Sequence, residues 1–213
     1  HVEGFRKYER LHKSLKKSVV GYFAMFCSGA KTYNSQEFLL AKYGVEKKDI
    51  VNFTYRTDGC LGYMKIETSS GRIVQVPYQE YHNLMRGFFT PNRCNLCMDH
   101  YGELADVSIG DIHVGKYIAD TVGVNSIIMR NKLFEKHLIE AQKAGYLTID
   151  PVSIDTIKAS QIYVERHQKG PGIVLHNKIR AVFQKPVPNY GYKIETKVTI
   201  KYYIRYLYNM IFR

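Results

Sequence analysis

The chain has 213 residues, of which 45% are hydrophobic and 13% aromatic, so it can bury a core. This composition excludes a disordered chain, and no apolar run approaches the ~18 residues that a membrane span requires. The formal net charge of +12 is shared among both ends and the middle of the sequence. Such a charge attracts polyanions, acidic cofactors or an acidic partner protein, but its spread is not typical of a dedicated nucleic-acid binder.

Hydrophobic periodicity and turn residues predict an alternation of helices and strands. In the first half of the chain we expect a helix over 4–14, a strand over 18–27 covered on both faces, a helix capped by Asn34 or Ser35 and ending at Gly44, a strand over 50–56 and a hairpin over 63–78. Strands over 105–111 and 125–130, a helix over 131–145, a strand over 147–153 and a helix over 153–170 are expected next. The chain is expected to end with an extended segment over 172–192 and an amphipathic segment over 196–213. This order predicts an α/β or α+β fold with a mixed β-sheet flanked by helices, an inserted hairpin and an irregular cysteine-bearing loop.

Four cysteines carry the clearest chemical signal, namely Cys27, Cys60, Cys94 and Cys97. Cys94 and Cys97 form a C-x-x-C motif, whose close spacing lets both sulfurs bind one metal centre. Four thiolates are the full complement for an iron–sulfur cluster or a structural zinc. The alternatives are a disulfide framework, a thioredoxin-type dithiol and, for Cys27 and Cys60, ordinary packing. The loop residues around the C-x-x-C motif favour a metal over a dithiol that begins a helix.

Three histidines near the motif, His82, His100 and His113, are candidate ligands or proton carriers. A solvent-exposed or hydrogen-bonded structural role is the alternative for each of them. The acidic residues of the region form no recognisable acid/base pair. The sequence also lacks phosphate-binding and nucleophile motifs, so nothing in it supports hydrolytic chemistry.

Residues 88–111, FFTPNRCNLCMDHYGELADVSIGD, resemble the signature of the beta-subunit family of coenzyme F420-reducing hydrogenases and dehydrogenases. The sequence FCSG at 26–29 resembles the upstream cysteine of that family. Residues 124–130, VNSIIMR, follow Gly123 and resemble its G-x-S/T-x-V/I-x-R strand. The opening HVEGFRKY resembles the continuation of a family cysteine motif, and residue 1 is His. We therefore expect the chain to be a fragment that begins just after that cysteine.

The resemblance implies an oxidoreductase that passes electrons between a 4Fe-4S cluster, FAD and a two-electron acceptor such as coenzyme F420. It implies that Cys27, Cys94 and Cys97 are cluster ligands, and that Cys60 or a cysteine before His1 is the fourth. The implied flavin contacts are Gly110, Asp111, Gly123, Asn125, Ser126 and Arg130. Because the family's small N-terminal module is absent here, we expect an incomplete FAD site and a fragment that is inactive alone.

The same reasoning divides the chain into a family domain over 1–170 and a basic, Tyr-rich extension over 171–213. The expected partner is a redox protein or ferredoxin-like donor in the cytoplasm, with no nucleic acid bound. A second hypothesis is a non-catalytic, zinc-stabilised basic module that binds nucleic acid or a partner protein. For residues 196–213, docking on the chain's own domain or on a second copy is favoured over contact with an acidic membrane surface.

Overall fold

The computed structural model describes residues 1–85, 89–163, 170–191 and 193–211. Contacts between Cα atoms divide the chain into two compact units, each built from segments that are far apart in the sequence. The first unit contains His1–Cys27, Asp99–Ile118 and Val124–Glu165, and the second contains Ser28–Met98, Ala119–Gly123 and Arg166–Arg213. The expected division into residues 1–170 and 171–213 stays a prediction.

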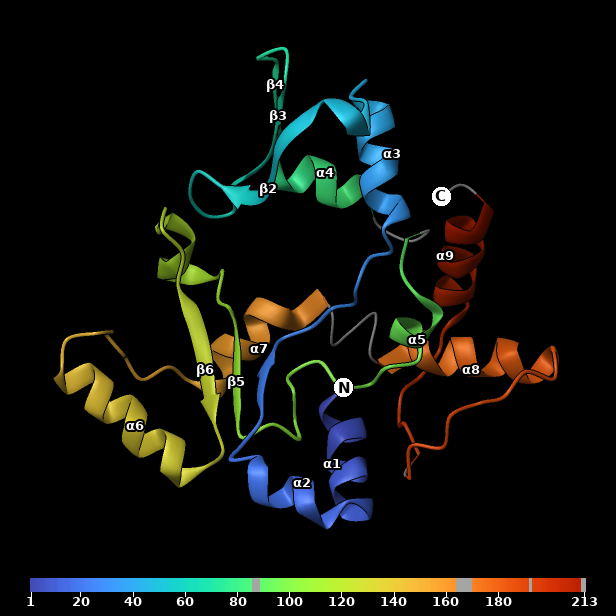
Figure 1. The fold of residues 1–213 in the computed structure, drawn as a ribbon. Helices are drawn as coiled ribbons and strands as arrows, with labels where there is room; N and C mark the ends of the chain where they lie inside the picture. Colours follow the sequence, from blue (N-terminus) through green and yellow to red (C-terminus); the bar gives the residue numbers. More distant parts are fainter. Residues whose placement is uncertain (86–88, 164–169, 192, 212–213) are drawn as a thin grey trace. The chain divides into compact units, whose positions relative to one another are not determined.

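A mixed three-stranded sheet with the strand order β1-β5-β6 forms the centre of the first unit (Figure 1). Strand β1 (Phe23–Met25) runs parallel to β5 (Val107–Asp111), and β5 pairs antiparallel with β6 (Asn125–Met129). The other elements of this unit are α1 (Val2–Leu11), α2 (Lys13–Ser18), the 3-10 helix at Gly115–Ala119, α6 (Lys132–Lys143) and α7 (Ile154–Tyr163). The expected mixed sheet flanked by helices is confirmed.

Helix α6 begins where its sequence predicts, because Asn131 caps it. The Asn131 Oδ1 accepts a hydrogen bond from the Leu133 N–H at 3.0 Å, which satisfies one of the free donors of the first turn. The Asn131 Nδ2 donates in turn to the Asp106 carboxylate at 2.9 Å and so joins the helix start to the loop before β5. The helix ends before Gly145, whose φ of +79° suits a residue without a Cβ.

An antiparallel sheet with the strand order β2-β3-β4 forms the centre of the second unit. Its strands are β2 (Ile50–Thr57), β3 (Tyr63–Thr68) and β4 (Ile73–Pro77). The helices of this unit are α3 (Asn34–Lys42), the 3-10 helix at Lys47–Asp49, α4 (Tyr78–Leu84), α5 (Asn92–Asn95), α8 (Ile173–Val182) and α9 (Ile200–Ile211). The predicted hairpin is confirmed as β3–β4, with Gly71 at φ +82° in its turn.

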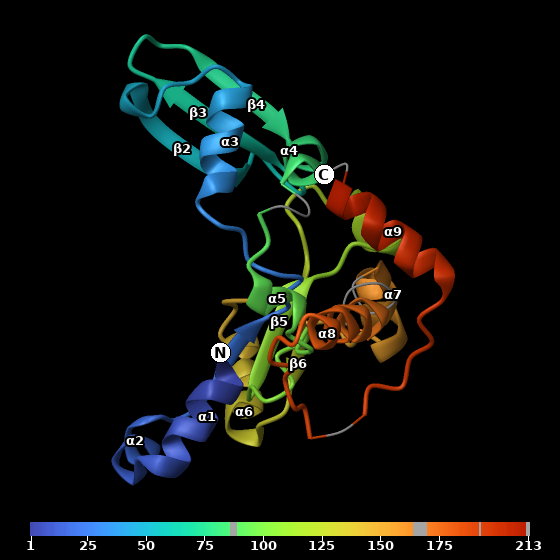
Figure 2. The ribbon, with the colours of Figure 1, turned by 90° about the vertical axis from the view of Figure 1, so that its right-hand side faces the viewer.

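The core of the second unit lies between this sheet and helices α3 and α4. Leu39 of α3 and Met64 and Ile66 of β3 are fully buried, and Tyr81 of α4 packs in the same cluster. Figure 2 shows α3 in front of one face of the sheet. The N-cap of helix α3 is Tyr33, one residue before Asn34, the nearer of the two predicted cap residues. Ser35 lies inside the helix, where its hydroxyl donates to the Thr32 carbonyl at 2.7 Å.

The apolar run over 18–27 forms a shorter and more open strand than predicted. Only Phe23–Met25 pair in β1, and the side chains of Phe23 and Met25 are 60% and 81% exposed. The expectation of a strand covered on both faces is therefore wrong. Strand β1 lies at the edge of its sheet and pairs with β5 alone. A run of apolar residues in such an edge strand does not show that their side chains are buried.

Two other segments differ from their predicted structure. Residues 147–153 form no strand, and Pro151 within them lacks the N–H that a sheet ladder requires. Residues 173–182, expected to be extended, form α8 instead. The prolines that suggested an extended chain, Pro186 and Pro188, follow this helix rather than interrupt it. The predicted helix over 153–170 is observed as α7 up to Tyr163, and its residues 164–169 lie outside the described residues.

The amphipathic segment expected near the end of the chain is helical over Ile200–Ile211, and its residues 212–213 lie outside the described residues. Ile200, Ile204 and Leu207 of α9 lie on one face of the helix and are exposed. Within the described parts of the chain, no helix has the length and apolar character needed to cross a bilayer. The favoured docking role of this segment stays a prediction.

Candidate functional site

The paired ends of β5 and β6 bring four of the predicted flavin contacts together. Gly110 of β5 is the register partner of Ser126 of β6, and Asp111 is the partner of Asn125. The Ser126 hydroxyl donates to the Gly110 carbonyl at 3.0 Å and ties the two strands together. These residues were predicted from two separate sequence motifs, and the antiparallel pairing places them at one end of the sheet of the first unit.

Gly110 is required by the close approach of an aromatic ring. A Cβ built at Gly110 would overlap the ring of Phe26, so any side chain at this position displaces the ring or the strand. The Phe26 ring meets the Tyr101 ring edge to face, with the centroids 5.0 Å apart. The glycine therefore lets an aromatic side chain close over the β5 backbone.

His100 is buried within the first unit and hydrogen-bonded on both ring nitrogens. Its side chain lies 3.0 Å from the Cys27 carbonyl through Nδ1 and 3.0 Å from Gln161 Oε1 through Nε2. The Cys27 N–H donates to the His100 carbonyl at 2.9 Å, so the two residues are clamped by main-chain and side-chain bonds. The Gln161 amide continues the network by donating to the Asp111 carbonyl at 2.9 Å. His100 thus takes the structural role that stood as the alternative for it, and it fixes the backbone of Cys27.

Arg130 uses its guanidinium within the first unit to hold the loop before β5. Its Nη1 donates to Ser108 Oγ at 2.6 Å and to the carbonyls of Gly102 and Ala105 at 3.2 and 3.3 Å. These acceptors belong to buried residues, and the Gly102 carbonyl also accepts from the Ala105 N–H and the Ser108 hydroxyl, so the guanidinium adds to a hydrogen-bond network that replaces lost hydration. This geometry gives Arg130 a structural task, and its predicted contact with a flavin stays a prediction.

Asp106 anchors the same loop from the other side. Burial of this carboxyl opposes its ionisation, but hydrogen bonds from the Asn131 side chain and the Tyr22 N–H, together with the nearby Arg6 guanidinium, outweigh burial and lower the pKa of Asp106. The Arg6 Nη2 lies 3.1 Å from the Asp106 Oδ2. An ionised Asp106 therefore joins α1, the start of β1 and the start of α6.

The C-x-x-C motif lies in the second unit on a single helical turn. Helix α5 presents Cys94, and the Cys97 N–H donates to the Cys94 carbonyl at 3.3 Å. The Ala30 N–H donates to the Cys94 Sγ at 3.4 Å. A hydrogen bond to sulfur stabilises the thiolate, which is the form that binds metals. The Cys94 thiol is partly exposed and the Cys97 thiol is exposed, so both are accessible for ligation.

Cys60 packs against Gly123, the one predicted flavin contact that belongs to the second unit. The Cys60 N–H donates to the Thr121 carbonyl at 2.8 Å. A Cβ at Gly123 would lie 3.2 Å from the Cys60 Cβ and 3.3 Å from its Sγ. The Asp120 Oδ1 accepts from the Val122 and Gly123 N–H groups and fixes the turn that carries this glycine. The pairing joins a candidate ligand to a candidate flavin residue that are far apart in the sequence.

All four cysteines lie in the described residues and none of them forms a disulfide, so the structure contains no disulfide framework. Cys27 belongs to the first unit and Cys60, Cys94 and Cys97 belong to the second. Among the described residues, no three His, Cys, Asp or Glu side chains form a group that could hold a metal ion. The donor chemistry of the C-x-x-C pair fits a thiolate-ligated centre, whereas the joint ligand set of four cysteines stays a prediction.

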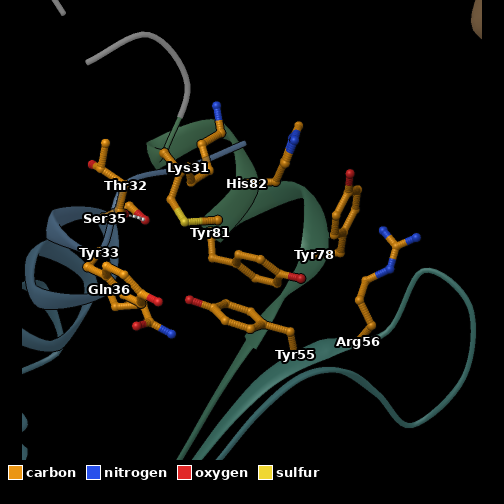
Figure 3. Close-up of a pocket in the computed structure, with 11 residues that line it drawn as sticks. Lys31, Thr32, Tyr33, Ser35, Gln36, Tyr55, Arg56, Tyr78, Tyr81 and His82 are labelled. Carbon is orange, nitrogen blue, oxygen red and sulfur yellow. Dashed lines mark hydrogen bonds between the residues drawn. The ribbon is translucent and has the colours of Figure 1, made fainter. Parts of the chain in front are cut away.

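A pocket in the second unit was not predicted from the sequence. It encloses about 370 Å³ and is lined by Lys31, Thr32, Tyr33, Ser35, Gln36, Tyr55, Arg56, Tyr78, Tyr81, His82 and Met85 (Figure 3). Tyr55 comes from β2, whereas Tyr78 and Tyr81 come from α4, which the hairpin separates from β2 in the sequence. The only sequence signal for the pocket was the density of tyrosine near Tyr78 and Tyr81.

A family model and several known proteins match the chain. The model of the family described as the C terminus of the coenzyme F420 hydrogenase/dehydrogenase beta subunit matches residues 1–155. An uncharacterized protein of Methanocaldococcus jannaschii, MJ1349, is 25% identical over 140 residues, which are 66% of this chain and 35% of that protein. A chain from the xenon-derivatized F420-reducing NiFe hydrogenase complex of Methanosarcina barkeri is similar in fold, with a TM-score of 0.59 at 16% identity. The match covers 90% of this chain and 62% of that chain, so the present chain spans only part of both relatives.

Proposed function

Because the chain belongs to the coenzyme F420 hydrogenase/dehydrogenase beta-subunit family, whose C-terminal region it matches, we propose that it is an electron-transferring oxidoreductase domain. In this proposal it carries a 4Fe-4S cluster and contacts a flavin, and it serves a two-electron acceptor such as coenzyme F420. When bound, such a cluster transfers single electrons and the flavin transfers hydride. The redox steps therefore take place on the cofactors, and the protein binds and orients them.

The observation that carries this proposal is the accessible C-x-x-C pair, in which the Cys94 Sγ accepts a hydrogen bond from a main-chain N–H. The Ala30 N–H lies 3.4 Å from the Cys94 Sγ, and Arg93 precedes Cys94 in the sequence. We propose Cys27, Cys94 and Cys97 as cluster ligands, with Cys60 as the fourth. The His100 clamp on the Cys27 backbone supports this assignment, because a ligand held at a fixed position loses less entropy on binding.

The flavin is assigned to the Gly110–Asp111 and Asn125–Ser126 strand ends, with Gly123 and Arg130 as further contacts. Asp111 and Asn125 are exposed at these strand ends and are the proposed points of approach for the flavin, because the Phe26 ring covers Gly110 and Ser126 is buried. The net charge of +12 favours acidic cofactors of this kind. The FAD site is proposed to be incomplete in this chain, with a redox protein or ferredoxin-like donor as the cytoplasmic partner.

Analysis of protein purified without oxygen tests the proposal against a zinc-stabilised binding module. We expect brown protein with broad visible absorption from the flavin and the cluster, and iron together with acid-labile sulfide. Colourless protein with stoichiometric zinc and no iron contradicts the electron-transfer proposal. A steep loss of nucleic-acid affinity with rising salt in that zinc protein would then support the basic binding module.

A further inference from the structure

Helix α9 carries an apolar face that is exposed in the described chain. Ile200, Ile204 and Leu207 of this face are 78%, 62% and 53% exposed. Tyr203 lies beside them, because residues three and four apart are neighbours on a helix. We propose that α9 is a lipid-binding helix, which lies flat on an anionic membrane surface and buries this face between the headgroups and the acyl chains.

The exposure and the charge of the segment favour a lipid surface over the two docking sites expected from the sequence. A helix docked on the chain's own domain would bury its apolar face, whereas Ile200 and Ile204 are exposed. Residues 196–213 contain no aspartate or glutamate, so two copies of the helix would bring only positive charges together. An anionic lipid surface instead complements both the apolar face and the charge.

The length of α9 suits a helix that lies on a bilayer rather than one that crosses it. Its 12 residues, Ile200–Ile211, span about 18 Å, whereas the hydrocarbon core is about 30 Å thick. An isolated helix of this length is marginal in water, because most helical stability comes from packing of the apolar face. Burial in the lipid interface supplies such packing, so a lipid surface stabilises α9 as well as binding it.

Exposed lysines at the start of α9 supply the attraction to anionic headgroups. Lys193, Lys197 and Lys201 recur at every fourth position and are all exposed, with Glu195 as the one acidic residue among them. Lys201 follows Ile200, so it lies about 100° from it around the helix axis, at the border of the apolar face. A lysine at this border reaches the headgroups while its methylene stem stays on apolar surface. Each lysine near an anionic surface adds on the order of fivefold to the affinity.

The tyrosines of α9 distinguish a lipid surface from a nucleic acid. Tyr203 and Tyr208 are exposed on the helix. Tyrosine is enriched at the level of the lipid headgroups, because its ring is apolar and its hydroxyl is polar. A nucleic acid would neutralise the lysines but leave Ile204 and Leu207 in water, whereas an anionic bilayer satisfies both parts of the segment.

Vesicle binding by the 213-residue chain tests the proposal and needs no cluster or flavin. The probes are phosphatidylcholine vesicles with and without phosphatidylserine, and co-sedimentation measures the bound fraction of protein. We expect binding to the anionic vesicles to be at least about tenfold tighter than binding to the neutral ones, and to weaken as the salt concentration rises. Equal binding to both kinds of vesicle overturns the proposal. Binding to neither also overturns it, and would leave an acidic partner protein as the occupant of this face.

Two triple variants locate the attraction to the anionic vesicles. The first carries Lys193→Gln, Lys197→Gln and Lys201→Gln, and it should bind these vesicles about tenfold more weakly or worse. The control removes the same charge from exposed lysines of α2, with Lys13→Gln, Lys16→Gln and Lys17→Gln. Its affinity should stay within about twofold of the wild type. Equal losses in the two variants would assign binding to net charge and overturn the proposal for α9.

The sequence contains no tryptophan, so a single introduced indole is a local reporter. In Tyr203→Trp we expect the fluorescence emission to shift to shorter wavelength on anionic vesicles, because the apolar face enters the lipid. Tyr146→Trp, at an 84% exposed position of the first unit, is the control and should show no shift. An unshifted emission in Tyr203→Trp contradicts burial of this face in lipid.

Ile204→Glu tests the apolar face itself. Because Ile204 is exposed, we expect an unchanged Tm, whereas the carboxylate in the apolar face should weaken vesicle binding at least about tenfold. Wild-type vesicle affinity in this variant overturns the proposal. So does a dimer that forms without lipid and dissociates in Ile204→Glu, because the face would then bind a second copy. Since no step needs iron or flavin, failure of the electron-transfer proposal would not alter these outcomes.

Discussion

The Ala30 N–H donates a hydrogen bond to the Cys94 Sγ across 3.4 Å. Gly29, at φ +135°, precedes this donor, and a Cβ there would lie 3.5 Å from the Cys94 Cβ. The backbone after Cys27 is therefore folded closely against the C-x-x-C turn within the second unit. This is the contact on which the assignment of Cys94 as a thiolate ligand mainly rests.

Replacing Ala30 by proline removes this N–H donor, whereas Ala30→Gly retains it. We expect the reduction potential of the bound cluster to become more negative in Ala30→Pro by an amount on the order of tens of millivolts, because the reduced, more negative cluster loses a stabilising hydrogen bond. A redox titration followed by electron paramagnetic resonance measures the shift. Equal potentials for the proline and glycine variants would show that this N–H does not act on the cluster.

Gly110→Ala tests the close packing of Phe26 on β5. The added methyl overlaps the Phe26 ring, so we expect a loss of about 1–3 kcal/mol in the free energy of unfolding. Gly4→Ala is the matched control, because a Cβ at Gly4 of α1 has nothing within 4 Å and alanine favours a helix. Thermal and denaturant unfolding of both variants give the comparison. A Gly110→Ala variant as stable as Gly4→Ala contradicts the packing described here.

Arg130→Met distinguishes a structural arginine from one that binds a flavin. Losing the guanidinium removes its hydrogen bonds to Ser108 Oγ and to the Ala105 carbonyl and one of the donors to the Gly102 carbonyl, so we expect a loss of about 1–3 kcal/mol and faster proteolysis within residues 101–106. Lys158→Met, at an exposed position of α7, provides the control for the lost charge. Reduced flavin content with unchanged Tm and protease resistance would instead place Arg130 at the cofactor.

Asp106 gives the first unit a predicted dependence on pH. Its pKa in the folded chain lies below the ordinary 3.8, so the ionised carboxylate stabilises the fold at pH values above 3.8. This stabilisation is lost as the pH falls through the lower, folded-state pKa. We expect Asp106→Asn to be less stable than the wild type near neutral pH and the difference to shrink as the solution is acidified.

Asp150→Asn is the control for Asp106, because it removes the same charge from an exposed side chain. Denaturant unfolding at several values between roughly pH 6 and pH 3 measures both differences. A constant gap between wild type and Asp106→Asn across this range would contradict the lowered pKa of Asp106. A matching trend in Asp150→Asn would assign the effect to net charge rather than to the contacts of Asp106.

Features with a local cause could be predicted from the sequence. The Asn131 cap, the glycine after α6 and the alternating pattern around Gly71 each determine their structure within a few residues, and all three are observed. The family resemblance implied that Gly110 and Ser126 both lie near a flavin, but their pairing in neighbouring strands was not predicted.

Features that depend on distant contacts could not be predicted. The exposure of Phe23 and Met25 follows from the edge position of β1, which an apolar run does not reveal. Cys60 meets Gly123 only through the fold, and the Tyr55–Tyr81 pair forms because α4 returns along the sheet. The hydrogen bonds from the Arg130 guanidinium to the Gly102 and Ala105 carbonyls could not be predicted, because a sequence motif does not show which carbonyls surround a side chain.

Iron and acid-labile sulfide content, measured per chain on protein purified without oxygen, tests the cluster assignment most directly. The set comprises the wild type, Cys27→Ser, Cys94→Ser, Cys97→Ser and, as a control in the same turn, Asn95→Ser. We expect about four iron and four sulfide in the wild type and in Asn95→Ser, and a marked loss in each cysteine variant. Wild-type iron and sulfide in Cys94→Ser and Cys97→Ser would contradict the assignment.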